Sequence, residues 1–240
     1  MLETVDLSRK LDQDEYKAVF AGLEQRLGEC QRAAREHGAP LIVVFEGWEA
    51  AGKGTCISRL ALAFDARGFK VHAVGPPNEE ERLRPWMWRF WNQLPSRDRI
   101  AIFDESWYRR VLSERVDRTA SDREIREAYD DILQLERQLS DAGYTIVKFF
   151  LHISKDEQKK RLKRLEKDPA LGWKVTKREW RLHEQYEHYL QAVEDMLRRT
   201  STAEAPWTIV ESHDRRFARV KAAETILAAW EQAIEAAAKG

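Results

Sequence analysis

The chain has 240 residues, and its 41 lysines and arginines are balanced by 41 aspartates and glutamates. Hydrophobic residues make up 43% of it, which is too apolar for a disordered chain and enough to bury a full core. The zero net charge excludes a wholly basic surface and argues against nucleic-acid binding. No apolar run is long enough to span a membrane, no signal peptide is recognisable, and two cysteines cannot form a disulfide framework. We therefore expect a cytoplasmic protein with neither a membrane nor a nucleic acid as partner.

The predicted elements alternate between helices and strands along the chain. A helical pattern over residues 12–37 comes first, in an N-terminal helical extension that we place at residues 1–40. Five short apolar runs, rich in β-branched and aromatic residues, are each typical of a strand that is buried on both faces. These runs are residues 41–45, 71–74, 100–103, 146–151 and 207–210.

Polar segments with apolar positions at helical spacing separate the strands. Residues 122–141 form one such segment, and its apolar stripe predicts an amphipathic helix. The stripe consists of Ile125, Tyr129, Ile132, Leu135 and Leu139. Strands that alternate with helices predict right-handed crossovers and a parallel sheet with helices on both faces. The predicted fold class is therefore α/β, as one three-layer α/β/α domain over residues 1–240 with a five-stranded parallel sheet.

The strongest motif follows the first predicted strand, in the segment GWEAAGKGT of residues 47–55. It completes the pattern G-x-x-x-x-G-K between a strand and a helix, which is the setting that a phosphate-binding loop requires. Such a loop turns backbone amides toward a phosphate, adds the positive end of a helix, and brings Lys53 to the outer phosphates. The predicted substrate-binding residues of this loop are Gly47, Gly52, Gly54 and Thr55. Gly54 stands where a magnesium-binding hydroxyl is usual, and Thr55 follows it.

A second motif begins where the strand over residues 100–103 ends. Asp104 follows this strand directly. In other proteins with a phosphate loop, the acid that binds magnesium stands in the same place, at the end of a strand. The segment ESWYRRVLSERV comes next, at residues 105–116. Together with GWEAAGKG and the later stretch RLKRLEKDPALGWKVT, it resembles the polyphosphate kinase 2 family of P-loop kinases. The resemblance covers roughly residues 41–220 and extends to the family's polyphosphate:AMP phosphotransferase branch.

The resemblance implies a P-loop kinase fold with a helical lid, and it implies roles for particular residues. Lys53, Asp104, Glu49 and Arg110 correspond to the family's catalytic residues, and Asp104 and Glu49 to its Mg²⁺ ligands. Arg110 is the arginine that follows S-W-Y. The implied contacts to phosphate outside the loop are Arg89, Arg161, Arg164 and Lys174, with Arg89 the weaker candidate.

Three positions depart from the family pattern. Glu49 replaces the loop aspartate, which keeps the charge but moves it by one methylene. Leu171 stands where the lid has a lysine. Glu105 stands where the family has an arginine, and an acid beside developing negative charge opposes phosphoryl transfer.

The segment over residues 155–181 is strongly basic and is predicted to be a lid insertion. It carries eleven lysines and arginines against five acids, a net charge of +6, so the rest of the chain carries −6. The break at Asp168-Pro169 and the joint at Gly172-Trp173 predict a helix–loop–helix that closes over the site. A mixed-charge solvated helix is the alternative, and we favour a patch that attracts a polyanion.

Two further features have competing interpretations. The aromatic residues Trp86, Trp88, Phe90 and Trp91 fit either a nucleobase platform or the packing of a helix, and we favour packing. Asp214 fits either the N-cap of the last helix or a place in the site, and we favour the cap.

Taken together, the motifs predict a polyphosphate-dependent nucleotide kinase that uses Mg²⁺. It would transfer a phosphoryl group between inorganic polyphosphate and a nucleoside mono- or diphosphate such as AMP or ADP, with ATP among its nucleotides. One alternative is an ATP-dependent kinase of the adenylate kinase type, although the chain lacks a D-G-[FY]-P-R stretch. Another is a polyphosphate- or nucleotide-binding protein impaired by Glu105 and Leu171. The resemblance also implies a homo-oligomer.

Overall fold

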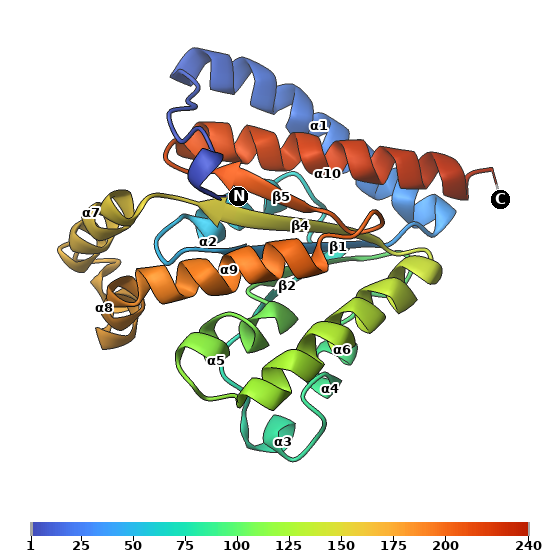
Figure 1. The fold of residues 1–240 in the computed structure, drawn as a ribbon. Coiled ribbons are helices and arrows are strands. Elements are labelled where there is room, and N and C mark those ends of the chain that lie inside the picture. Colours follow the sequence, from blue (N-terminus) through green and yellow to red (C-terminus); the bar gives the residue numbers. More distant parts are fainter. Residues whose placement is uncertain (1, 240) are drawn as a thin grey trace.

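The computed structural model describes residues 2–239. In this range five parallel strands form a sheet in the order β2-β3-β1-β4-β5, with helices on both faces (Figure 1). The strands are β1 (Leu41–Gly47), β2 (Phe69–Ala73), β3 (Ile100–Asp104), β4 (Thr145–His152) and β5 (Trp207–Glu211). Each predicted run overlaps one of them, so the predicted α/β class and parallel sheet are confirmed. The expected burial on both faces is wrong for β2, which lies at the edge of the sheet and has no buried residue.

Long helices form the layers above and below the sheet. Figure 1 shows α1 (Gln13–His37) and α10 (Arg215–Ala237) on one side, and α6 (Asp122–Asp141) and α9 (Tyr186–Thr200) on the other. The helix α10 packs on β4, β5 and α2 (Lys53–Ala61), while α1 packs along α10. The predicted helix over residues 122–141 is confirmed, and the side chains of its apolar stripe are all buried.

The remaining elements are short, apart from a pair that projects from one end of the sheet. This pair is α7 (Lys155–Glu166) and α8 (Lys177–Glu184), joined through η3 (Gly172–Lys174), and it forms the predicted helix–loop–helix (Figure 1). The other short elements are η1 (Leu2–Thr4), α3 (Glu79–Arg82), α4 (Trp88–Trp91), η2 (Trp107–Arg110) and α5 (Ser113–Val116).

Polar side chains fix where the long helices begin. Asp12 accepts hydrogen bonds from the amides of Asp14 and Glu15 at the start of α1, both at 2.9 Å. Ser121 and Glu124 form a reciprocal capping box on α6. Asp214 caps α10 by accepting from the amide of Phe217 at 2.8 Å, so the interpretation of Asp214 as a cap is confirmed.

A buried ion pair ties the second motif to the centre of the sheet. Lys148, in the middle of β4, is fully buried, and its Nζ lies 2.6 Å from Oε2 of Glu136 on α6. Oε1 of Glu136 accepts from Tyr108 Oη at 2.7 Å and from Trp107 Nε1 at 3.1 Å. Because Trp107 and Tyr108 are also buried, this network anchors η2 against the core.

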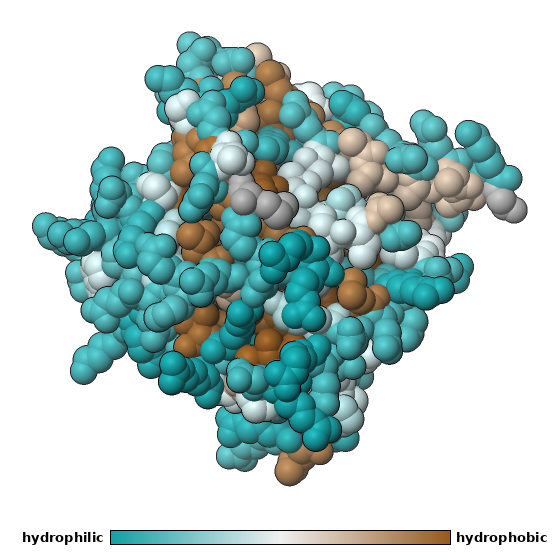
Figure 2. Space-filling view, viewed as in Figure 1, coloured by the Kyte–Doolittle hydropathy of each residue, from teal (hydrophilic) through white to brown (hydrophobic). Residues whose placement is uncertain are grey.

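The surface is mostly polar. Figure 2 shows hydrophilic residues over most of this face, with apolar residues visible between the helices. The large apolar side chains that are exposed in residues 2–239 are Val19, Leu62, Val71, Leu83, Trp91 and Trp173. None of the helices in this range has the length and hydropathy that a transmembrane span requires.

Candidate active site

The phosphate loop connects β1 to α2, and two glycines shape it. Gly47 has φ +151°, and a Cβ there would lie 2.6 Å from the carbonyl oxygen of Leu151 on β4, so a larger residue cannot fit. Gly52 has φ +106° and caps the N-terminus of α2. Thr55 donates its hydroxyl hydrogen to the carbonyl of Gly52 at 2.9 Å. The predicted strand–loop–helix setting is therefore present, with the positive end of α2 at the loop.

Lys53 stands at the start of α2 among four carboxylates. Its Nζ donates to the carbonyl of Gly47 at 3.2 Å, which folds the side chain back across the loop. Burial alone would lower the pKa of Lys53, but Glu49, Glu105, Asp104 and Glu46 raise it above its usual value. Lys53 is therefore a permanent cation at neutral pH.

Asp104 lies beside the loop because β3 pairs with β1 in parallel. In that register Asp104 is opposite Phe45, two residues before Gly47. A Cβ at Gly54 would lie 3.8 Å from Asp104 Oδ2, which places this carboxylate against the first turn of α2. Burial raises the pKa of Asp104, and Lys53 and Lys174 oppose that rise. The fold thus brings Lys53 and Asp104 together, with Lys174 of the lid close enough to act on the same carboxylate.

Glu49 lies in the loop and is held by the lid. Its Oε1 is 3.3 Å from Nη1 of Arg178 on α8, a residue that the motif analysis missed. Burial raises the pKa of Glu49, while Lys53 and Arg178 lower it. Across residues 2–239, no three His, Cys, Asp or Glu side chains are grouped as a complete metal site. Glu49 and Asp104 are carboxylates of the kind that bind Mg²⁺, which is usually held by one or two carboxylates plus substrate phosphates.

Glu105, the acid that stands where the family has an arginine, is paired with a positive charge. Its φ of +60° turns the chain at the end of β3, and its amide donates to the carbonyl of Phe45 at 3.0 Å. The carboxylate forms an ion pair with Arg109, one turn later in η2. An arginine therefore balances the acid at this position. The i,i+4 spacing of Glu105 and Arg109 could have predicted this ion pair from the sequence.

Glu46, next to the loop, is a buried acid. It lies at the end of β1 and accepts a hydrogen bond from Ser106 Oγ at 2.8 Å. Burial, and then the charge of Glu105, raises the pKa of Glu46 to about 8. Glu46 therefore carries a proton through most of the neutral range.

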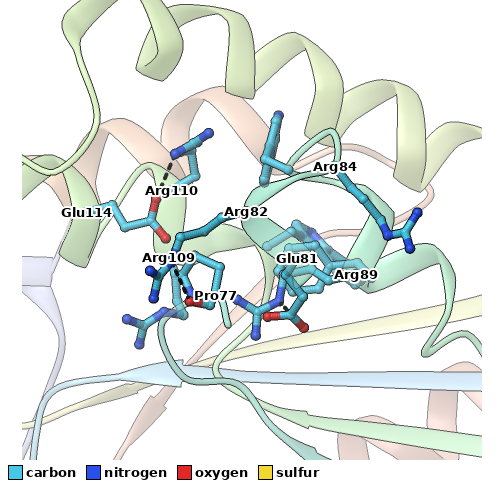
Figure 3. Close-up of a pocket in the computed structure, with 11 residues that line it drawn as sticks. Pro77, Glu81, Arg82, Arg84, Arg89, Arg109, Arg110 and Glu114 are labelled. Atoms are coloured by element: carbon cyan, nitrogen blue, oxygen red, sulfur yellow. Dashed lines mark hydrogen bonds and ion pairs between the residues drawn. The ribbon is translucent and has the colours of Figure 1, made fainter. Parts of the chain in front are cut away.

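A pocket rich in arginines opens beside this cluster, between η2 and the α3–α4 segment (Figure 3). Arg110 is held by Glu114 at 3.0 Å and lies over the ring of Trp86. Arg89 donates to the carbonyl of Gly75 at 3.0 Å. The residues that line the pocket are Pro77, Glu81, Arg82, Arg84, Trp86, Arg89, Phe90, Trp107, Arg109, Arg110 and Glu114. Five arginines and two glutamates line the pocket, and Arg84 and Arg109 pair with two further acids, Glu80 and Glu105, so the cations outnumber these four acids by one.

Buried donors in this pocket remain free. Within the described chain, Nε of Arg109 and Nε of Arg110 have no hydrogen-bond partner, although both atoms are buried. Buried polar groups in native proteins are nearly always paired, so unpaired ones point to an absent partner. Trp86 and Phe90 line the same pocket, and Trp91 is 45% exposed. The predicted role of these aromatic residues in helix packing therefore does not account for all of their surroundings.

The predicted lid cations have different surroundings. Arg164 and Lys174 are exposed. Arg161 is 3% exposed, and its guanidinium donates to backbone carbonyls of the phosphate loop and of the segment after β5. Its position on α7 differs from the expectation of a free phosphate contact.

The loop also makes an aromatic contact with α9. Trp48, inside the loop, is 2% exposed and stacks on Tyr186 at the start of α9, with ring centroids 4.0 Å apart. Its Nε1 donates to Nδ1 of His152 at 2.8 Å. Burial lowers the pKa of His152 to about 4, so the ring is neutral and can accept this hydrogen bond.

Comparisons with known proteins agree with this architecture. The family model for Polyphosphate kinase 2 (PPK2) matches residues 10–238. A Pseudomonas aeruginosa protein named polyphosphate:AMP phosphotransferase is 44% identical over 239 residues, which are 100% of this chain and 47% of that protein. A Rhizobium meliloti protein named ADP-polyphosphate phosphotransferase 3 is 32% identical over 212 residues, covering 88% of this chain and 75% of the relative.

Solved structures show the same relationship. A polyphosphate kinase 2 structure from Pseudomonas aeruginosa has a TM-score of 0.94 and 44% identity, and the match covers 98% of this chain and 50% of that one. A polyphosphate kinase 2 structure from Arthrobacter aurescens has a TM-score of 0.92 and 31% identity, and the match covers 97% of this chain and 85% of that one. The chain thus spans about half the length of the Pseudomonas relative. With its loop, strand-end acid and helical lid on a P-loop kinase fold, the chain belongs to the polyphosphate kinase 2 family.

Proposed function

We propose that this protein transfers a phosphoryl group between inorganic polyphosphate and a nucleoside mono- or diphosphate. One observation carries the proposal: Lys53 and Asp104 are linked to two separate cationic surfaces, because Lys174 of the lid acts on Asp104, while Arg109 of the arginine pocket pairs with Glu105, whose charge acts on Lys53. The lid, with the exposed Arg164 and Lys174, is one surface, and the arginine pocket is the other. A transfer between two phosphate compounds needs a place for each of them on either side of the shared lysine.

The chain's own residues would act by positioning and by charge. Lys53 and the loop amides would hold the phosphates at the point of transfer, and Arg110 would neutralise the charge on the transferring group. Mg²⁺ would be held by Asp104 and Glu49, and when bound it would screen the phosphate oxygens from one another. The lid would exclude water and so limit hydrolysis.

The two surfaces differ in a way that supports a separate substrate for each. The pocket is small, combines arginines with Trp86 and Phe90, and contains the free Nε atoms of Arg109 and Arg110. It suits the acceptor nucleotide, whose phosphate would meet the arginines and whose base would meet an aromatic side chain. The open lid suits a long polyanion. AMP and ADP are the acceptors to try first, because they appear in the names of the relatives.

Glu105 bears on the rival proposal of an impaired binding protein. The ion pair between Glu105 and Arg109 partly offsets the acid's charge inside the protein, which supports an active enzyme. The arrangement of residues 1–240 as one domain, a homo-oligomeric state and a cytoplasmic location stay predictions.

The test is direct. Purified protein is mixed with polyphosphate, Mg²⁺ and either AMP or ADP, and nucleotides are separated by chromatography. Conversion of AMP or ADP to the next higher phosphate is expected, and Lys53→Met should lower the rate at least about 100-fold. Arg123→Met, on the exposed face of α6, is the matched control. Turnover of ATP with AMP in the absence of polyphosphate would favour the ATP-dependent alternative, and binding of polyphosphate with no turnover would favour the impaired protein.

A further inference from the structure

The back of the phosphate loop is held by side chains of α7. Three consecutive carbonyls of the loop, those of residues 49–51, face this helix. Gln158 Nε2 donates to the carbonyl of Glu49 at 3.3 Å. Nη1 of Arg161 donates to the carbonyls of Ala50 and Ala51, at 3.2 and 3.0 Å. Gln158 and Arg161 are both buried, at 1% and 3% exposure.

Arg161 uses every donor that it has. Besides the two bonds from Nη1, its Nη2 donates to the carbonyls of Ser212 and His213 at 2.7 and 2.8 Å. Its Nε donates to Glu157 Oε1 at 2.7 Å. A guanidinium carries five N–H groups, so no hydrogen is left for a phosphate. The segment after β5 joins the same cluster, because Ser212 Oγ also donates to the carbonyl of Ala51, at 2.7 Å.

Fixing these carbonyls also fixes the amides of the loop. In a trans peptide the C=O and the following N–H point in opposite directions. With the carbonyls of Glu49 and Ala51 held toward α7, the amides of Ala50 and Gly52 are turned away from it. Such inward-turned amides are the groups with which a phosphate loop binds anions. The non-glycine Ala50 also has φ +61°, a conformation that needs support from its surroundings.

We propose that Arg161 and Gln158 are positioning residues that hold the phosphate loop in its binding shape from behind, without contacting polyphosphate. This inference rests on the proposed function, and it adds a connection between the loop and the lid helices. Oε1 of Gln158 lies 2.8 Å from Nδ1 of His183 on α8, the lid helix that also carries Arg178. The rear support of the loop and its lid contact at Glu49 thus belong to the same helical pair.

The experiment compares two arginines on one helix, buried Arg161 and exposed Arg164. A direct phosphate contact releases counterions, so its loss lowers the slope of log affinity against log salt by about one. We expect Arg164→Met to lower this slope for polyphosphate binding. Arg161→Met should keep the slope and lower kcat about 10- to 100-fold, because a misplaced reacting group is costly to the rate.

Arg161→Lys separates charge from geometry. Lysine keeps the positive charge but has three donors at a single point, so it cannot serve the four carbonyls that Arg161 bridges. The lysine variant should therefore behave like Arg161→Met, and circular dichroism checks that it is folded. Near wild-type kcat in Arg161→Lys, together with a lower salt slope in Arg161→Met, would overturn the proposal.

A further readout does not depend on catalysis. Amide hydrogen exchange of the ligand-free protein should speed up in the loop of residues 48–54 in Arg161→Met and Gln158→Leu, and stay unchanged in Arg164→Met. Unchanged exchange in the first two variants would refute the positioning role even in an active enzyme. Faster exchange in these two variants, together with a wild-type protein that shows no phosphoryl transfer, would instead leave the positioning role standing and refute the proposed function.

Discussion

Replacing Lys148 by methionine tests whether the buried ion pair supports the segment that carries the site arginines. Nζ of Lys148 donates to Glu136 at 2.6 Å, to the carbonyl of Thr200 at 2.7 Å and to Tyr108 Oη at 2.9 Å. Glu136 in turn accepts from Tyr108 and Trp107. The methionine variant removes the cation and leaves this acid buried.

The structure sets the size of the effect. Both side chains of the pair are at most 2% exposed, so water cannot screen the charge that remains. Removal of one partner of a buried ion pair typically costs about 3–5 kcal/mol, a large part of the roughly 5–15 kcal/mol that stabilises a domain. Burial already raises the pKa of Glu136, so protonation of this acid should limit the loss to about 3 kcal/mol.

A second variant separates the charge from the packing. In Lys148→Met/Glu136→Gln the buried charge is gone, while an amide oxygen still accepts from Trp107 or Tyr108. We expect the double variant to be more stable than Lys148→Met by about 1–2 kcal/mol. Urea unfolding followed by circular dichroism gives each free energy. A loss under about 1 kcal/mol in the single variant, or a double variant no more stable than it, would refute the reasoning.

Three further predictions concern the site. The pKa of Glu46 is about 8 in the folded protein, against an ordinary value of 4.5, so the unfolded chain loses this proton first as pH rises. The stability of the protein should therefore fall between about pH 4.5 and 8. Glu46→Gln should remove that fall, which thermal unfolding across this pH range measures. Glu105→Arg leaves Arg109 unpaired beside a like charge and should lower kcat/KM about tenfold, and a gain in rate would contradict the pairing role. Arg178→Met removes a charge that lowers the pKa of Glu49, so the acid limb of the pH–rate profile should move to higher pH, and an unmoved limb would exclude Glu49 as its source.

Local sequence was sufficient for the fold. Apolar runs bounded by polar segments located all the strands of the described sheet, and the stripe over residues 122–141 located α6 to the residue. The ends of the strands were less visible. β1 continues through Glu46 and Gly47, since pairing with β4 carries the ladder beyond the apolar run. A polar residue and a glycine give no local signal for that pairing.

The sequence predicted those site residues whose positions depend on strand ends and on the phosphate loop. Lys53 and Asp104 follow adjacent parallel strands, so their proximity follows from the topology. Arg161 and Arg164 look alike in the sequence, but α7 packs one against the loop and exposes the other. Lys148 was an overlooked signal, because a lysine inside the apolar run of residues 146–151 requires a buried partner, and Glu136 lies twelve positions before it.

The strand order has a consequence for the way this protein folds. β1 is paired with β3 and β4, whose residues follow it by about 60 and 100 positions, so the central pairings close long loops. Sheets that depend on such non-local pairings fold slowly. Lys53 and Asp104 come together only when β3 joins β1, and the rear support of the loop waits for β5 and α7. During synthesis on the ribosome, therefore, phosphate-binding capacity should emerge late, only after the segment that follows β5 has been made.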